Sequence, residues 1–331
     1  MSPRALGLSF DDPQLEQAVR ARLDDIEALL RTSVHSDDEF IGGAASHLVD
    51  AGGKRFRPLV TTLAALFGDA SRPEIVPSAV VCELTHLATL YHDDVMDEAT
   101  VRRGASSANA RFDNSVAILT GDFLFARAST ILADLGPWAV RLQALTFERL
   151  VAGQIHETVG PEPGADPIAH HLQVLADKTG SLIATAAEFG AHFAGASQDV
   201  IDHLRRYGEQ IGVAFQVMDD ILDIASESTE SGKTPGTDLR EGVPTLPVFY
   251  ALQDTSPEGA RLRSLVSRPL VDDDEHAEAL ALLRASDAMV AARSTLATYA
   301  DTARATLEQL PDVPARGALE ALTDLVVDRN G

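Results

Sequence analysis

The clearest helical signal in the chain lies at residues 200–223, which read VIDHLRRYGEQIGVAFQVMDDILD. Apolar residues recur there at intervals of three or four, at Val200, Leu204, Tyr207, Ile211 and Phe215. This spacing puts them on one face of a helix and predicts that this face is buried. The stretch ends in a cluster of aspartates, so several carboxylates are expected close together at the end of this long helix.

The same helical spacing recurs along nearly the whole chain, and prolines and glycines divide it into segments of helical length. Helices are predicted at 12–32, 38–51, 57–68, 77–97, 113–134, 137–158, 167–178, 180–194, 197–226 and 245–254, with two or three more after residue 270. The least structured stretches are expected at 98–112 and 226–243. Strand-like alternation and linker-like tracts are not evident, so the sequence predicts a single all-α domain over residues 1–331.

The composition excludes several classes of function. The 331 residues carry 50 acidic against 27 basic side chains, a formal net charge of -23, which repels nucleic acids and anionic membranes. No apolar run is long enough to predict a transmembrane segment, and the N-terminus lacks the pattern of a secretion signal. The single cysteine, Cys82, cannot form an internal disulfide. We therefore expect a soluble, cytoplasmic protein that does not bind nucleic acid.

Two copies of the motif Asp-Asp-x-x-Asp carry the first sign of chemistry, at Asp93, Asp94 and Asp97 and at Asp219, Asp220 and Asp223. In each copy the first and third carboxylates stand one turn apart on a helix, and the middle one is rotated by about 100°. Such carboxylates repel one another unless cations bridge them, and Mg²⁺ commonly bridges carboxylates to substrate phosphates. One acidic motif would equally well be a solvated helix end. Two identical motifs favour a diphosphate held through metal ions.

The basic residues point to the same kind of ligand. Positive charge is concentrated in GGKRFRP at 52–58 and in RRG at 102–104, within an otherwise acidic chain. Fixed cations near metal-bound carboxylates indicate anionic phosphates as ligands. Lysine survives at three positions only, Lys54, Lys178 and Lys233.

Taken together, these segments resemble the all-trans isoprenyl diphosphate synthases of the polyprenyl synthetase family, from about residue 50 to 250. The matching segments read GGKRFRP at 52–58, ELTHLATLYHDDVMDEATVRRG at 83–104, GDFLFARA at 121–128, GQIHE at 153–157, KTGSL at 178–182, FQVMDDILD at 215–223 and GKTPGTDLREG at 232–242. All three lysines fall inside these segments. The resemblance implies that each chain forms a bundle of mostly antiparallel helices around a deep central cavity, with the two aspartate motifs facing each other across its mouth. It also implies that two such chains form a homodimer.

The resemblance also implies roles for individual residues. The six motif aspartates would bind three Mg²⁺ ions that grip the diphosphate of an allylic substrate, which would be geranyl, farnesyl or geranylgeranyl diphosphate. That grip would be completed by Arg102, Lys178, Gln216 and Lys233. The diphosphate of isopentenyl diphosphate would be held by Lys54, Arg57, His86 and Arg103. Thr179 would stabilise the allylic cation, which the alkene of isopentenyl diphosphate attacks before a proton is lost to the released diphosphate.

Product length in this family depends on the space below the first aspartate motif. Counting back from Asp93, the small residues Ala88, Thr85 and Cys82 fall roughly one turn apart. No aromatic residue or inserted pair closes this region in the sequence, which predicts an open tunnel. The expected product is hexaprenyl to decaprenyl diphosphate, with octaprenyl or nonaprenyl favoured, as the precursor of a quinone side chain. Alternatively, the small residues only allow close helix packing, and a bulky residue such as Phe125 closes the cavity.

Three other functions stay open at this point. A geranylgeranyl or farnesyl diphosphate synthase would use the same chemistry and stop earlier. A non-catalytic subunit of a heteromeric synthase would usually lack one aspartate motif, and both are intact here. A class I terpene cyclase would normally lack the second Asp-Asp-x-x-Asp and the GGKRFRP segment.

Overall fold

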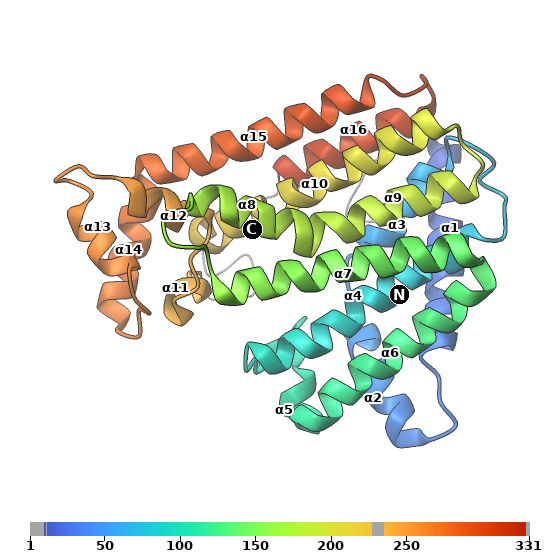
Figure 1. Ribbon diagram of the computed structural model, residues 1–331, viewed down its shortest axis with the longest axis horizontal. Coiled ribbons are helices and arrows are strands. Elements are labelled where there is room, and N and C mark those ends of the chain that lie inside the picture. Colours follow the sequence, from blue (N-terminus) through green and yellow to red (C-terminus); the bar gives the residue numbers. More distant parts are fainter. Residues whose placement is uncertain (1–9, 11, 227–234, 329–331) are drawn as a thin grey trace. The chain divides into compact units, whose positions relative to one another are not determined.

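Helices make up most of the computed structural model, which describes residues 10, 12–226 and 235–328 (Figure 1). The chain divides into two compact units, each formed by three separate stretches of sequence. The first unit comprises Met1–Glu148, Leu182–Gly208 and Thr306–Ala321, and the second comprises Arg149–Ser181, Glu209–Ala305 and Leu322–Gly331. Among the described residues, the only strands are two of two residues each, which pair as an antiparallel hairpin. The predicted all-α class is confirmed.

The elements agree closely with the predicted helices. In chain order they are α1 Pro13–Ser33, α2 Glu39–Asp50, α3 Phe56–Ala65, α4 Ile75–Met96, β1 Val101–Arg102, β2 Ala105–Ser106, α5 Ala108–Phe112, α6 Asn114–Leu135, α7 Pro137–Val159, α8 Pro167–Leu175, the π-helical turn η1 Ala176–Gly180, α9 Ser181–Phe193, α10 Gln198–Ala225, α11 Thr237–Glu241, α12 Leu246–Gln253, α13 Ala260–Val266, α14 Asp273–Ala285, α15 Asp287–Leu307 and α16 Pro314–Val327. The hairpin and the short helices α5, α11 and α13 were not predicted.

The core of the first unit is built around α4. This helix packs along α6 and also contacts α1 and α3. It is buried on nearly every side, with Val80, Cys82, Leu84 and Leu87 all inaccessible to solvent. A helix that is apolar all round belongs inside a protein, whereas the amphipathic α1 covers the core with one face. The first aspartate motif thus lies at the C-terminal end of α4, the helix at the centre of this unit.

Close approach between α9 and α3 depends on Gly190. A Cβ atom at this position would lie 2.1 Å from the backbone oxygen of Thr61, far inside contact distance. Gly190→Ala is therefore expected to destabilise the protein by about 2–3 kcal/mol, because two backbones must separate. Gly43→Ala is the matched control, since a Cβ there meets nothing within 4 Å inside α2 and should add up to about 1 kcal/mol of stability. Denaturant unfolding of both variants measures the difference, and equal stabilities would contradict this packing.

The second unit contains the C-terminal part of α10 and the helices α8 and α11 to α14. The last turn of α10 is capped by Arg284 from α14, which donates to the backbone oxygens of Ile224 at 2.7 Å and Ser226 at 2.9 Å. A cation at a helix C-terminus satisfies carbonyls that lack partners within the helix and interacts favourably with the helix dipole. This cap fixes the end of the helix just after the second aspartate motif.

One helix, α6, is long and apolar enough to cross a membrane by length and composition. No such run was predicted. However, α6 packs along α4 and carries Asp122, Arg127 and Asp134. By itself this finding is weak evidence for a membrane span, because core helices of soluble proteins and signal sequences pass the same length and composition test.

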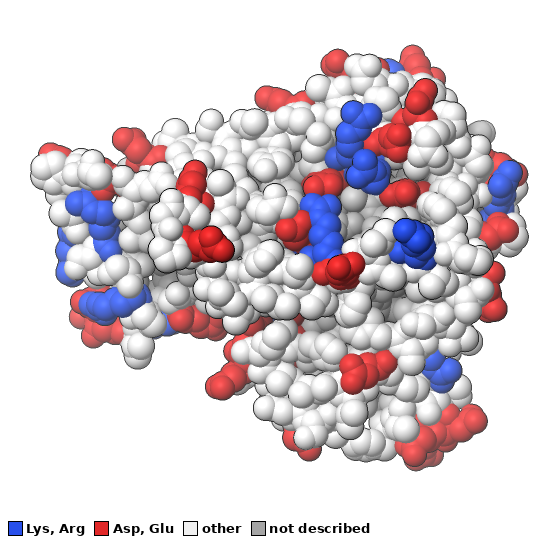
Figure 2. Space-filling view, viewed as in Figure 1, with Lys and Arg blue, Asp and Glu red and all other residues white. Residues whose placement is uncertain are grey.

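Many surface charges occur in pairs. In the view of Figure 2, blue and red side chains lie beside one another in small groups. Arg20 with Glu16 and Arg261 with Glu278 are examples, at 2.6 and 2.5 Å. Exposed pairs of this kind contribute about 0–1 kcal/mol each. The charges that shape a binding site are the buried ones described next.

Candidate functional site

The first aspartate motif stands where α4 leaves the core. Asp97 follows the last helical residue, and its backbone N–H donates to the backbone oxygen of Asp93 at 2.8 Å. Four positions apart, the two carboxylates project from the same side of the helix end. Asp93 is half-buried, and the side chain of Asp97 is 57% exposed. This outer pair remains partly open to solvent.

The middle aspartate of this motif has a different environment. Asp94 is fully buried, and its Oδ1 accepts a hydrogen bond from Arg102 Nε at 2.6 Å. Its Oδ2 accepts from the backbone N–H of Ala108, the first residue of α5, at 3.0 Å. Both oxygens of Asp94 are therefore engaged by protein donors. They connect α4 to β1 and to α5, and they hold Arg102 beside the outer carboxylates, with its Nη2 3.8 Å from Asp97.

The second motif, on α10, repeats this arrangement. Asp220 is buried, and its Oδ2 bonds to His171 Nε2 at 2.9 Å and accepts from the backbone N–H of Leu246 at 3.1 Å. Leu246 is the first residue of α12. In both motifs the middle carboxylate thus binds one basic side chain and the first N–H of a following short helix. The outer residues, Asp219 and Asp223, are half-buried.

Other predicted residues of the second unit lie on η1 and α10. Lys178 and Thr179 are in the π-helical turn, and Lys178 Nζ contacts Glu157 Oε2 on α7 at 2.6 Å. A Cβ at Gly153 would lie 2.7 Å from the backbone nitrogen of Lys178, so only glycine lets α7 approach this turn. Gln216 is half-buried on α10. The remaining one, Lys233, lies outside the described residues.

Arginines gather in the first unit around His86; Arg55 is buried, and Arg57, Arg102 and Arg103 are half-buried. The pKa of His86 is lowered well below the usual range by burial and by the charges of Arg57, Arg103, Arg102 and Arg55. The ring is therefore neutral near pH 7. The structure brings together four residues predicted to bind diphosphate, His86, Arg57, Arg102 and Arg103, close enough to influence one another's charge.

Within this cluster, Arg57 has unsatisfied hydrogen-bonding capacity. Its Nε atom is buried and has no hydrogen-bond partner in the protein. Burial lowers the pKa of Arg57, and the charge of Arg103 adds to that effect, whereas Glu83 opposes it. An arginine remains protonated in proteins nonetheless. A buried cation with an orphaned donor favours an anionic ligand, because that ligand supplies the missing acceptor.

The loop before α3 shapes the edge of this cluster. Gly52 and Gly53 have φ values of 91° and 152°, which favour glycine, and Lys54 beyond them is exposed. A Cβ at Gly53 would lie 2.9 Å from both Arg103 Cζ and Arg55 Nη1. Arg103 Nη1 also donates to the backbone oxygen of Gly52. The two glycines therefore let two guanidinium groups pass directly against the loop backbone.

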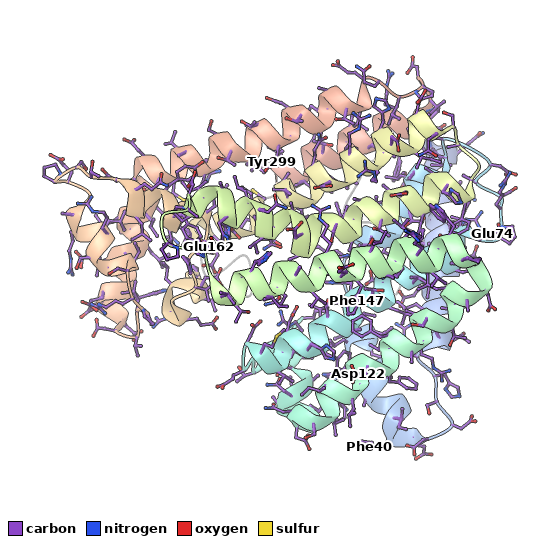
Figure 3. All side chains as sticks on the ribbon, in the orientation of Figure 1. Phe40, Glu74, Asp122, Phe147, Glu162 and Tyr299 are labelled. Atoms are coloured by element: carbon purple, nitrogen blue, oxygen red, sulfur yellow. The ribbon has the colours of Figure 1, made fainter. Side chains whose placement is uncertain are left out.

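His92, which sequence reasoning left out, anchors the end of α4. Its Nε2 bonds to the backbone oxygen of Ile118 on α6 at 3.0 Å and lies 3.5 Å from Asp122 Oδ1. Its ring packs on Phe125, which in turn contacts Phe147 of α7; Asp122 and Phe147 are labelled in Figure 3. The histidine beside Asp93 thus holds this part of the helix against α6 and its aromatic neighbours.

The three residues predicted to set chain length are tightly packed. Cys82, Thr85 and Ala88 expose at most 1% of their surface. Thr85 Oγ1 accepts a hydrogen bond from Gln143 Nε2 on α7 at 2.9 Å. Close helix packing by small residues, one of the two readings of this stripe, accounts for their burial. A growing tail that passes here has to displace neighbouring side chains.

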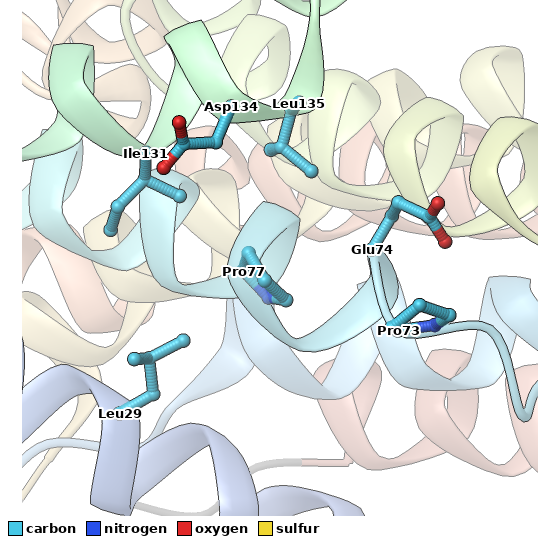
Figure 4. A pocket seen from close by; sticks show the side chains of 7 residues that line it. All are labelled: Leu29, Pro73, Glu74, Pro77, Ile131, Asp134 and Leu135. Atoms are coloured by element: carbon cyan, nitrogen blue, oxygen red, sulfur yellow. The ribbon is translucent and has the colours of Figure 1, made fainter.

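An apolar groove of about 300 Å³ lies elsewhere in the first unit, near the start of α4 (Figure 4). It is lined by Leu29, Pro73, Glu74, Pro77, Ile131, Asp134 and Leu135. Pro77 precedes Asp93 by sixteen residues, or roughly 24 Å of helix. The groove is therefore separate from the charged cluster at the other end of α4.

Divalent cations were predicted at the aspartates. Among the residues that the structure describes, no group of three or more histidine, cysteine, aspartate or glutamate side chains is gathered as a metal site. The outer carboxylates nevertheless supply the hard oxygen donors that Mg²⁺ and Ca²⁺ prefer. Mg²⁺ commonly takes only one or two protein carboxylates and completes its shell with water and substrate phosphate. The donor chemistry fits such an ion.

Comparison with known proteins identifies a matching family and several similar proteins. A sequence model described as polyprenyl synthetase matches residues 38–283. A nonaprenyl diphosphate synthase of Mycobacterium tuberculosis is 52% identical over 326 residues, covering 98% of this chain and 97% of that protein. A dimethylallyltranstransferase of the same organism is 42% identical over 318 residues, covering 96% of this chain and 97% of that protein.

A solved structure is similar over almost the full length. It is the geranylgeranyl pyrophosphate synthase of Corynebacterium glutamicum, complexed with calcium and isoprenyl diphosphate. The TM-score is 0.88 at 47% sequence identity, and the match covers 98% of this chain and 99% of that chain. Both the sequence likeness and the fold likeness therefore extend well beyond the motif-bearing segments.

Proposed function

The chain belongs to the polyprenyl synthetase family, and from this premise we propose that it condenses an allylic diphosphate with isopentenyl diphosphate, repeatedly, to an all-trans polyprenyl diphosphate. The chain is thus a trans-prenyltransferase. The observation that supports this proposal is the half-buried cluster of Arg57, Arg102 and Arg103 around neutral His86, with Arg102 Nη2 3.8 Å from Asp97 Oδ2. The cluster supports the proposal because it would give an anion positive charge close to a carboxylate suited to a divalent ion.

We propose two roles for the aspartates of the two motifs, metal binding and positioning of neighbouring groups. Asp93, Asp97, Asp219 and Asp223 would hold the metal, for which we propose Mg²⁺ with three ions per active site. When bound, these ions neutralise the diphosphate leaving group. We assign Asp94 a positioning task instead of the metal binding expected for it, because protein donors already occupy both of its oxygens. Asp220, whose two contacts are both on Oδ2, keeps the proposed metal binding beside its positioning task.

The residues around isopentenyl diphosphate bind and orient it. Arg57 would donate its unpaired Nε–H to the diphosphate, and Lys54 and Arg103 would add charge. Neutral His86 would donate one hydrogen bond. These contacts would hold the alkene against the allylic carbon, so that positioning lowers the barrier of the condensation.

Residues of the second unit would act on the allylic substrate. Lys178, Gln216 and Lys233 would bind its diphosphate, and the hydroxyl and backbone dipoles at Thr179 would stabilise the developing allylic cation. In the structure, Lys178 contacts Glu157, so diphosphate binding would exchange that partner for a phosphate oxygen. We further propose that residues 1–331 work as one synthase domain, with both aspartate motifs serving the same reaction.

For the product we propose octaprenyl or nonaprenyl diphosphate, a precursor of a quinone side chain. Support comes from the nonaprenyl diphosphate synthase that is 52% identical to this chain. A shorter, geranylgeranyl product is the second candidate. The close packing of Cys82, Thr85 and Ala88 and the 47% identical geranylgeranyl pyrophosphate synthase structure favour it.

Ala88→Phe tests where the tail runs. A tail that passes here has to displace the side chains packed around Ala88. Because a phenylalanine ring would take up the room so made, the variant is expected to shorten the longest product by several isoprene units while still consuming substrate. Chromatography of the dephosphorylated products measures the change. A long product that stays unchanged in Ala88→Phe would show that the tail follows another route.

We also propose a cytoplasmic homodimer. In the first unit, Ile118 and Leu119 on α6 and Val140 and Leu145 on α7 expose apolar side chains. A second copy of the chain would cover them, since exposed apolar side chains favour burial in interfaces.

The allylic primers that we propose for the condensation are geranyl, farnesyl and geranylgeranyl diphosphate.

Incorporation of labelled isopentenyl diphosphate by the purified chain distinguishes this function from the others. Condensation requires both the primer and a divalent cation. Release of a hydrocarbon from the allylic substrate alone would instead identify a terpene cyclase. Absence of turnover by the chain alone, with activity restored by a second protein, would identify a non-catalytic subunit.

A further inference from the structure

Arg55, in the glycine-rich loop, is saturated by contacts within the protein. A guanidinium carries five N–H donors. Those of Arg55 bond to Glu27 Oε2 at 2.8 Å and Oε1 at 3.3 Å, to Glu83 Oε1 at 3.1 Å, and to the backbone oxygens of Val49 at 3.3 Å and Gly52 at 3.4 Å. Arg55 therefore has no donor left for a phosphate, unlike Arg57 two residues later.

Glu27 provides the bidentate half of this network. It lies on α1, before residues 38–283 that match the family model. Burial raises the pKa of Glu27, but hydrogen bonds from Arg55 and the charges of Arg55 and Arg31 lower it by more in total. The carboxylate is thus ionised at neutral pH, and it also bonds to Arg31 at 3.0 Å.

The network holds a strained backbone. Arg55 has a φ of 51° and a ψ of 38°, in the left-handed region, which is unfavourable for a residue with a side chain. Arg55 is also the residue immediately before α3, so its conformation sets the direction in which that helix starts. Lys54 precedes it and Arg57 stands in the first turn of the helix. The orientation of both cations therefore depends on Arg55.

We propose that Glu27 is a positioning residue for isopentenyl diphosphate: with Glu83 it clamps Arg55 in the left-handed conformation and so directs Lys54 and Arg57 toward the diphosphate. This inference rests on the proposed function. It extends the substrate site to α1, whose other ion pairs lie on the surface. Glu27 touches no reacting atom and acts only through Arg55.

Glu27→Gln tests the proposal, with Glu16→Gln as the matched control. Glu16 is also on α1 and pairs with Arg20 at 2.6 Å, but the side chains of that pair are 32% and 42% exposed, against 17% for Glu27 and 6% for Arg55. Glu27→Gln is expected to raise KM for isopentenyl diphosphate about tenfold, because the clamp loses its charge, as the removal of partners that orient binding groups typically does. KM for the allylic primer should stay within about twofold. Glu16→Gln should leave both constants unchanged.

Direct binding supplies a readout that does not depend on turnover. Calorimetric titration with isopentenyl diphosphate alone, without primer, should show a Kd about tenfold higher for Glu27→Gln than for the unmodified chain. Arg55→Lys should reproduce the effect, since an ammonium cannot make the five bonds of the guanidinium. If Glu27→Gln does not fold, Glu27→Asp keeps the charge and is expected to show the same split between the two KM values.

The outcomes separate this inference from the function itself. If the unmodified chain does not condense the two substrates, the proposed function fails. If it does, and Glu27→Gln leaves the affinity for isopentenyl diphosphate unchanged, the clamp is wrong. Equal increases in both KM values, in parallel with a fall in Tm, would overturn it as well, because they would show a merely structural role.

Discussion

Replacing Asp93 with asparagine is expected to lower the rate of condensation by about a thousandfold or more, equivalent to about 4 kcal/mol of transition-state stabilisation. The asparagine keeps the size of the side chain and removes its charge. Hard divalent cations bind carboxylates much better than amides in sites that also hold phosphates. Without the ion, the diphosphate leaves with its negative charge uncompensated, and the barrier rises accordingly. Steady-state turnover at saturating substrate measures the loss.

Two further variants show whether the effect belongs to the metal site. Asp122→Asn, on the neighbouring α6 with an exposed side chain, should retain normal turnover. Asp94→Asn should change the Mg²⁺ concentration needed for activity much less than Asp93→Asn, because Arg102 and Ala108 occupy its oxygens. Near-normal turnover of Asp93→Asn would contradict the role given to this residue.

Arg57→Gln is expected to raise KM for isopentenyl diphosphate about a hundredfold and to leave KM for the allylic primer nearly unchanged. A hydrogen bond between charged groups contributes about 1.5–3 kcal/mol, and each 1.4 kcal/mol corresponds to a tenfold change. We expect a loss toward the upper end of this range, because the buried Nε atom of Arg57 has no other hydrogen-bond partner. Substrate titrations of each diphosphate, with the other held saturating, measure the two constants.

The conservative variant shows what the guanidinium contributes beyond its charge. Arg57→Lys should recover part of the affinity, because it restores a cation but lacks the planar fork that binds phosphate through two parallel bonds. An increase of both KM values by the same factor in Arg57→Gln would mean that this side chain does not discriminate between the substrates. That result would contradict the assignment of Arg57 to isopentenyl diphosphate.

Most of the helical framework could be predicted because burial and periodicity coincide. The apolar stripe from Val200 to Phe215 on α10 was visible in the sequence, and proline or glycine marked most boundaries. The hairpin at 101–106 was not predictable, because two-residue strands show no alternation. It is accompanied by a bond between Arg102 and buried Asp94, a tertiary contact that local sequence does not reveal.

The candidate site was predictable where motifs carry it and not where the fold supplies the partners. The aspartates could be proposed as metal ligands from their spacing, and Arg57 and His86 as diphosphate ligands only from the resemblance of their segments to a known family. His171 is 49 residues from Asp220 along the chain and has no local signal that connects them. Glu27 looked like any polar residue on an amphipathic helix, and only the structure shows its contact with Arg55. Residues that position others thus remain hidden until the fold brings them together.

The central claim is tested most directly by incubating the purified chain with Mg²⁺, isopentenyl diphosphate and farnesyl or geranylgeranyl diphosphate, followed by mass spectrometry of the dephosphorylated products. The account predicts a ladder of all-trans products that differ by one isoprene unit and end at eight or nine units, as octaprenyl and nonaprenyl products would. A ladder that ends at three or four units would keep the chemistry and overturn the product length. No condensation at all would contradict the claim that this chain is a polyprenyl diphosphate synthase.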